Sequence, residues 1–178
     1  PTYDRREVYR QTQEHYKGID PVESAVFRRA TPITVDEMRT LVIKYPRTVN
    51  APIVKRDCIY VALDYKRRGF NPILLNMSSW TSAGGGVVNG ASAQEEELFR
   101  RSNYFKHLHQ KYYPYRNYDT TVSKGVEFFR WGSDRGYVPM DQPVALDCIA
   151  APAPKHPRLT PACDDFATDK RSEEHTSE

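Results

Sequence analysis

The sequence predicts a mixed α/β fold built as one domain. Short apolar runs typical of buried strands alternate along the chain with segments that have the apolar spacing of amphipathic helices. Of the 178 residues, 39% are hydrophobic and 28% are charged, and the 13 prolines and 12 tyrosines fit a soluble α/β domain with long polar connections. A chain of this length has room for one ordinary domain.

Two helices are expected near the start of the chain. Residues 3–16 are polar and rich in helix formers, and Gly18 follows at a position typical of a helix end, so we expect a surface helix there. The segment "TVDEMRTLVIKYP", which begins at Thr34, has an N-cap candidate, acids in its first turn and Pro46 as a stop. It is predicted to form a second helix.

A strand, a helix and another strand are expected next. The segment "APIVKRD", starting at Ala51, is predicted to be a short strand. Asp57 is a candidate N-cap for a helix over "CIYVALDYKRRG" that ends at Gly69. The run "NPILLNM" is apolar and bounded by turn residues, which predicts a strand buried on both faces. The helix is expected to turn four residues inward, Ile59, Val61, Ala62 and Tyr65.

The end of the alternation is rich in strand formers. The segments "TTVSKGVEFFRW" and "GYVPMDQ" predict an antiparallel pair around the turn from Gly132 to Gly136. The run "PVALDCIAAPAP" predicts another buried strand. The result is a single mixed α/β layer structure with no internal repeat.

The stretch "SAGGGVVNGASAQEEELFRRS", from Ser82 to Ser102, contains the strongest chemical signal. Taken separately, Ser92 and Glu95 have the spacing of a capping box, and three glycines are more often a tight turn than a binding loop. Taken together, a strand, a glycine-rich loop and a helix N-terminus form the arrangement that holds phosphates in α/β folds. On a helical wheel Glu96 lies opposite the predicted buried face and can therefore face a cleft. That buried face consists of Leu98, Phe105 and Leu108.

Several neighbouring residues have a simpler interpretation. Glu97 is predicted to be a solvated helix residue and Phe99 a core residue, whereas Tyr104 is left open between the core and stacking on a base. His107 and His109 are two positions apart, which makes a poor metal pair on a helix, and both are predicted to lie at the surface.

Basic residues and tyrosines alternate in residues 106–116, a pattern that can indicate binding of single-stranded nucleic acid. With a net charge of only +3, a plain surface loop is favoured, and no field commits the chain to nucleic acid or to a membrane. No direct DNA binding and no membrane association are expected.

The three cysteines are widely spaced and form no CxxC pair, so neither a disulfide framework nor a zinc site is indicated. Cys58 and Cys148 are predicted to be small buried residues. No apolar run is long enough to span a membrane, and the N-terminal segment lacks the apolar core of a signal peptide. A cytoplasmic protein is expected, with a nuclear location as the alternative.

Three glycines, seven residues and then "QEE", running from Gly84 to Glu96, resemble the signature of poly(ADP-ribose) glycohydrolases. The flanking segments "SKGVEFFR" and "ALDCIAAPAP" resemble the microbial-type branch of that family, and the likeness extends from Ile53 to Pro154. The resemblance implies a macrodomain-like three-layer α/β/α fold with a mixed sheet. It departs at Ser82-Ala83, because the family has Asn-Pro before the glycines.

The resemblance also implies site residues. Glu96 would be the catalytic acid, and Glu95 would position the ribose. Gly84, Gly85 and Gly86 would border the diphosphate and the proximal ribose. The other expected ADP-ribose contacts are Asn76, Ser82, Val87 and Gln94.

The activity implied by the resemblance is hydrolysis of the ribose–ribose O-glycosidic bond of poly(ADP-ribose), which releases ADP-ribose. Such cleavage needs an acid for the leaving oxygen and a carboxylate to activate water, and Glu96 can serve both steps in succession. No cofactor and no metal are expected. The expected partner of a monomeric enzyme is ADP-ribose or poly(ADP-ribose) on modified proteins. The alternatives are a reader that binds ADP-ribose without cleaving it, and an inactive truncated fragment.

The expected organisation has four parts. Residues 1–50 form an N-terminal helical extension that packs on the domain, and residues 51–154 form a partial macrodomain-like catalytic core. Residues 155–170 form an irregular tail. The last eight residues, "RSEEHTSE" at 171–178, are interpreted as the translation of a sequencing-library adapter. The family's second glycine-rich loop would follow the end of the chain, so the fold is expected to be incomplete at the C-terminus.

Overall fold

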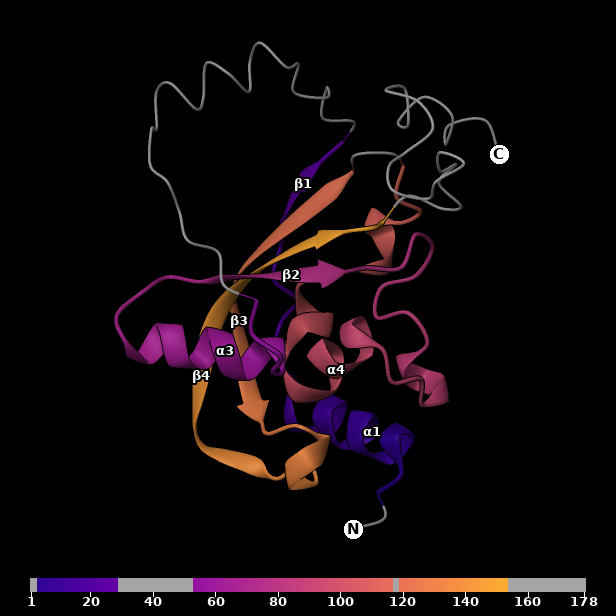
Figure 1. Cartoon of the computed structure of the whole chain (residues 1–178). Coiled ribbons are helices and arrows are strands. Elements are labelled where there is room, and N and C mark those ends of the chain that lie inside the picture. Colours follow the sequence, from indigo (N-terminus) through magenta and orange to yellow (C-terminus); the bar gives the residue numbers. More distant parts are fainter. Residues whose placement is uncertain (1–2, 29–52, 117–118, 154–178) are drawn as a thin grey trace, which may run out of the picture.

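A four-stranded mixed sheet with helices packed on one face is the framework of the molecule (Figure 1). The structure is a computed structural model that describes residues 3–28, 53–116 and 119–153. Strand order is β1-β3-β4-β2, with β2 parallel to β4 and the other neighbours antiparallel. The helices are α1 (Arg5–His15), α3 (Cys58–Arg67) and α4 (Gln94–Arg101), and the strands are β1 (Ala25–Phe27), β2 (Ile73–Met77), β3 (Thr120–Arg130) and β4 (Pro139–Ala151).

The predicted mixed α/β fold is confirmed. Helices over residues 3–16 and after Asp57, the strand in "NPILLNM", the helix after the glycines and the antiparallel pair are all present. Helices α1, α3 and α4 lie on the same side of the sheet in Figure 1. The second helical layer of the predicted three-layer arrangement stays a prediction. The predicted helix after Thr34, the tail at 155–170 and the segment 171–178 lie outside the described residues and also stay predictions.

Two strand predictions need correction, and one strand was not predicted. The described part of "APIVKRD", residues 53–57, forms no strand, and Ile53 is fully exposed. Residues 139–151 form one continuous strand of 13 residues, where the sequence predicts two separate segments. Strand β1 has no counterpart in the prediction, because its three residues are too few to show periodicity.

Strand β2 is buried on one face only, so the prediction of burial on both faces is wrong. Leu74 and Asn76 face the helices and are buried, whereas Ile73, Leu75 and Met77 are 61%, 51% and 60% exposed. Alternation is the expected pattern for a strand that is covered on a single side. Among the described residues, helices cover only the side of Leu74 and Asn76.

The core lies between the sheet and the helices. Helix α3 contributes Ile59, Ala62 and Leu63, while the predicted inward residue Tyr65 is exposed and Val61 is half-buried. Helix α4 is short, so the predicted wheel beyond Arg101 does not apply. The core also contains Leu98, Phe99, Leu108, Val126, Phe128, Leu146 and Cys148.

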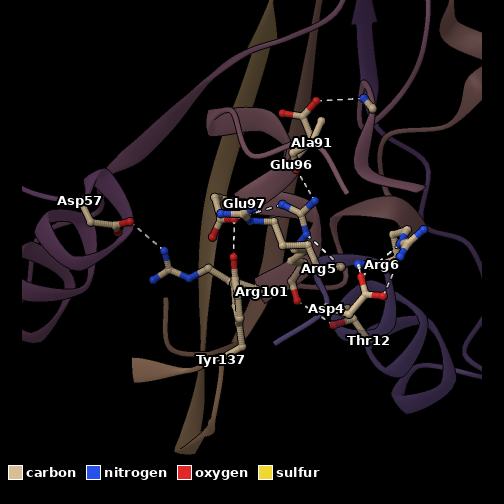
Figure 2. Close-up of polar contacts among 12 residues, drawn as sticks. Asp4, Arg5, Arg6, Thr12, Asp57, Ala91, Glu96, Glu97, Arg101 and Tyr137 are labelled. Atoms are coloured by element: carbon tan, nitrogen blue, oxygen red, sulfur yellow. Dashed lines mark hydrogen bonds and ion pairs between the residues drawn. The ribbon is translucent and has the colours of Figure 1, made fainter. Parts of the chain in front are cut away.

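Asp57 joins two helices through one carboxylate (Figure 2). Its Oδ1 caps α3 by accepting from the backbone N–H of Tyr60 at 3.0 Å, and its Oδ2 accepts from Arg101 Nη1 at 2.8 Å. The side chain of Arg101 is 0% exposed. We expect Asp57→Ala to lower the free energy of unfolding by about 2 to 3 kcal/mol, because it removes a cap and leaves a buried guanidinium without its anion.

Urea unfolding of the two proteins measures this loss. Asp4→Ala is the matched control, because Asp4 also caps a helix, accepting from the N–H of Arg6, but its ion pair with Arg6 is exposed. The control should therefore lose less stability than Asp57→Ala. Equal losses would contradict the role assigned to the buried pair.

Candidate active site

A cavity of about 450 Å³ opens where the carboxyl end of β2 meets the glycine loop and the first turn of α4. Such a position beyond the end of a sheet strand is where ligands bind in open α/β folds. The walls of the cavity are formed by Met77, Ser78, Ser79, Thr81, Ser82, Gly85, Gly86, Ala93, Glu95 and Glu96.

The glycine loop begins with a tight turn. The N–H of Gly85 donates to the carbonyl of Ser82 at 3.1 Å, and Gly84 at the third position of this turn has φ +77°. These are features of a type II turn, which requires a positive φ at its third residue. A Cβ on Gly84 would also lie 2.6 Å from the ring of Phe99. Both the positive φ and the close contact with Phe99 therefore require glycine at this position.

Gly85 lets the backbone approach the acids. It has φ +52°, and a Cβ there would lie 2.5 Å from Glu96 Oε1. The neighbouring amides are turned toward carboxylates: Gly84 N donates to Glu95 Oε1 at 3.2 Å, and Gly86 N donates to Glu96 Oε1 at 2.9 Å. The loop therefore fixes both glutamates. The predicted use of its glycines to border a diphosphate stays a prediction.

Glu95 is 4% exposed and lines the cavity beside Glu96. Its carboxylate accepts from Asn76 Nδ2 at 3.2 Å, from Ser79 N at 2.7 Å and from Gly84 N at 3.2 Å. The capping-box alternative is wrong, because the N-cap of α4 is Ala93 and makes no side-chain cap bond. Three donors from β2 and the loops hold Glu95 instead.

Glu96 is 7% exposed and faces the cavity with one bound and one unbound oxygen. Oε1 accepts from Gly86 N, and Oε2 is buried without a hydrogen-bond partner among the described residues. Figure 2 shows Glu96 pointing away from Tyr137, whereas Glu97 points toward it. A buried carboxylate oxygen with no donor is costly unless a ligand or a proton completes it, and the predicted role of Glu96 as the catalytic acid stays a prediction.

Asn76 is fully buried and does not line the cavity, but it contacts Glu95, which does. Gln94 binds the backbone of β2 on both sides of Asn76. Its Oε1 accepts from Met77 N at 2.9 Å, and its Nε2 donates to the carbonyl of Leu75. Val87 is buried in the core. Gln94 and Val87 do not line the cavity, and their contact with a ligand stays a prediction.

Of the predicted site residues, five line the cavity directly, namely Ser82, Gly85, Gly86, Glu95 and Glu96. The cavity is also lined by five residues that were not predicted, Met77, Ser78, Ser79, Thr81 and Ala93. The available signal was the polar run "SSWTS" directly after a buried strand, which is where ligand contacts gather in α/β folds.

Glu97 is bonded to two other side chains, so the prediction that it is a solvated helix residue is wrong. It accepts from the hydroxyl of Tyr137 at 2.6 Å and from Arg100 Nη1 at 3.0 Å. Arg100 is fully buried and also donates to the carbonyls of Ala91 and Arg5. This network fastens α1 to the segment between the glycine loop and α4.

The aromatic segment at 106–116 belongs largely to the core, so its prediction as a plain surface loop is wrong. Its tyrosines 112, 113 and 115 are buried and are not free to stack on a nucleic acid, and Tyr104 is buried as well. His107 is 3% exposed, which contradicts its predicted surface position, and His109 is partly buried.

Cys148 is buried as predicted, whereas Cys58 is exposed at the start of α3. In the parts of the chain that the structure describes, no group of three or more His, Cys, Asp or Glu side chains is placed to hold a metal. Within the same parts, no helix has the length and apolar character needed to cross a bilayer.

Burial raises the pKa of Glu95, against the hydrogen bonds from Ser79, Asn76 and Gly84 that lower it. A carboxyl whose pKa is higher in the folded than in the unfolded protein binds its proton more tightly when folded. Its contribution to stability therefore falls as pH rises from the unfolded value near 4.5 through the folded value, and is constant above that.

We expect the free energy of unfolding of the wild type, measured relative to Glu95→Gln, to decrease as the pH rises from about 4.5 through the folded-state pKa of Glu95. Urea unfolding of both proteins at steps from about pH 4 to about pH 7 measures the difference, in which carboxylates that do not interact with Glu95 cancel. A relative stability that rises with pH would contradict the assignment.

The sequence of the chain matches the model of a known protein family. The model described as the catalytic domain of microbial-type PARG matches residues 4–127. The match includes α1, which lies before the part of the chain where the motifs are recognisable. No curated protein sequence matches the chain.

Solved structures match at low sequence identity. Poly(ADP-ribose) glycohydrolase from Thermomonospora curvata, bound to the inhibitor ADP-HPD, has 19% identity and a TM-score of 0.65, with 84% of this chain and 63% of that chain covered. The enzyme from Deinococcus radiodurans in complex with ADP-ribose has 23% identity and a TM-score of 0.56, with 74% and 54% covered. These likenesses show the fold, and this chain spans less than two thirds of the length of either protein.

Proposed function

The chain belongs to the family of microbial-type poly(ADP-ribose) glycohydrolase catalytic domains, and from this we propose that its protein hydrolyses the ribose–ribose O-glycosidic bond of poly(ADP-ribose). The observation that carries the proposal is Glu96, which faces a polar cavity with Oε1 fixed by Gly86 N and Oε2 unbonded among the described residues. ADP-ribose would occupy the cavity between Ser78–Ser82 and the glycine loop.

Glu96 would act twice in this reaction. Cleavage of the glycosidic bond passes through an oxocarbenium-like state, and the protonated Oε2 of Glu96 would give its proton to the leaving ribose oxygen. The resulting carboxylate would then take a proton from the water that attacks the anomeric carbon, which restores the acid. The Gly86 amide holds the other oxygen in place during both steps.

Glu95 would orient the ribose and keep the loop in shape. Its carboxylate is held by donors from three different segments, so it is a fixed acceptor beside Glu96. Fixed acceptors near the reacting sugar lower the entropy that must be lost in reaching the transition state.

Incubation of poly(ADP-ribose) with the protein, followed by chromatography of the released ADP-ribose, tests the proposal. Because the chain spans 63% of the Thermomonospora chain, both the 178-residue protein and the product of its full reading frame should be assayed. Release of ADP-ribose by the full product is expected. Binding without release would identify a reader, and the absence of binding and release from both proteins would reject the function.

A protein carrying single ADP-ribose units is the second substrate for this assay. Release from the polymer but not from the singly modified protein would identify the ribose–ribose bond as the one that is cut. Release from the singly modified protein alone would reassign the reaction to the bond between ADP-ribose and the protein side chain.

A further inference from the structure

Gln110 connects the aromatic segment to the loop that precedes the glycines. Its Oε1 accepts from the backbone N–H of Ala83 at 3.1 Å, and its Nε2 donates to the carbonyl of Thr81 at 3.0 Å. The two bonds use both ends of the side-chain amide, and they bracket Ser82.

An amide that binds the carbonyl of one residue and the N–H two residues later acts as a neighbouring parallel strand does. It restrains the backbone of the residue between them, here Ser82. This restraint extends to the glycine loop, because Ser82 supplies the carbonyl that accepts from the N–H of Gly85. Thr81 and Ser82 themselves line the cavity.

The segment that carries Gln110 is well anchored. Residues 110–112 form a short 3-10 helix, and the tyrosines 112, 113 and 115 that follow are buried. The backbone N–H of Tyr115 donates to the carbonyl of Trp80 at 2.8 Å, which adds a second attachment to the same loop. A side chain on a packed segment can hold a functional loop more firmly than a side chain on a mobile one.

Ala83 occupies the second position of the turn from Ser82 to Gly85, where a proline would fix φ covalently. Alanine leaves φ unrestrained but provides the N–H that Gln110 binds. We propose that Gln110 is a positioning residue, which holds the loop from Thr81 to Gly85 in the conformation that binds ADP-ribose. The identity of the ligand rests on the proposed function. The effect of Gln110 on the loop does not depend on it.

Four proteins and one control, Lys111→Ala, test the proposal: the four are the wild type, Gln110→Ala, Ala83→Pro and the double variant. In Gln110→Ala we expect hydrogen exchange of the Ala83 and Gly85 amides to become roughly three- to tenfold faster, since one hydrogen bond and the loop restraint are lost. The Kd for ADP-ribose and the KM for the polymer should rise roughly five- to tenfold, with kcat within about twofold of the wild type.

Rescue separates positioning from a general loss of stability. Proline at 83 supplies the restraint without the amide, so adding Ala83→Pro to Gln110→Ala should return the Kd to within about threefold of the wild type. Lys111→Ala is the matched control, because Lys111 lies in the same short helix but pairs with Glu23. It should leave exchange at Ala83 and Gly85 unchanged.

Unchanged exchange at both amides in Gln110→Ala would overturn the proposal, and so would a double variant that binds no better than Gln110→Ala. If the wild-type full product neither binds ADP-ribose nor cleaves the polymer, the proposed function fails. The exchange measurements would still decide whether Gln110 holds the loop.

Discussion

Glu96→Gln is expected to reduce the kcat for poly(ADP-ribose) hydrolysis by at least about a thousandfold, because an amide can neither donate the required proton nor serve as the base. The substitution is isosteric, and the amide oxygen of glutamine can still accept from Gly86 N, so the loop should keep its shape. The Kd for ADP-ribose should therefore stay within about threefold of the wild type. Chromatography of released ADP-ribose and titration calorimetry measure the two quantities.

Glu97→Gln is the matched control, since it changes the next residue of the same helical turn. Glu97 contacts Tyr137 and Arg100 rather than the cavity, so its loss should lower stability and leave kcat within a few-fold of the wild type. Normal turnover by Glu96→Gln would remove the catalytic role assigned to Glu96.

Gly85→Ala is expected to reduce kcat/KM by at least about a hundredfold. The new methyl group would lie 2.5 Å from Glu96 Oε1 and 3.2 Å from Glu95 Oε2, so either the loop or the carboxylates must move. A displacement of about 1 Å at a reacting group is enough for an effect of this size. The left-handed backbone adds a stability loss of roughly 1 to 2 kcal/mol.

Gly125→Ala isolates the backbone part of this effect. Gly125 has φ +66°, but a Cβ there would meet nothing within 4 Å. We expect both alanine variants to be destabilised, as measured by urea unfolding, and only Gly85→Ala to lose activity. Equal activity in the two variants would mean that the close approach of Gly85 to Glu96 does not matter for the reaction.

Hydrogen bonds over long sequence separations explain most of the errors in the sequence interpretation. Ser92 and Glu95 have capping-box spacing, yet Glu95 is drawn away from the helix terminus by donors from β2 and from two loops. Spacing rules consider only neighbours in sequence, and in the folded chain a buried carboxylate gains more from three donors than from one cap.

The burial of several residues differs from the prediction because polar residues surround them in the sequence. The tyrosines at 112, 113 and 115 alternate with basic and polar residues, and a tyrosine places its ring in the core whenever its hydroxyl can be tolerated there. For β2 the difference has the opposite sign: its apolar run predicts two covered faces, whereas the described helices cover one.

The amino-acid order alone predicts the succession of strand, glycine loop and helix, the Asp57 cap and the family signature from Gly84 to Glu96. Each of these depends on residues close together in the chain: positive φ selects glycine, a cap selects a short acceptor, and periodicity selects strand or helix. The packed fold is needed to see that three donors hold Glu95, that Glu97 binds Tyr137 and Arg100, and that Gln110 is bonded to the loop in front of the glycines. Those roles are set by donors and acceptors that approach one another only when the sheet and its helices pack.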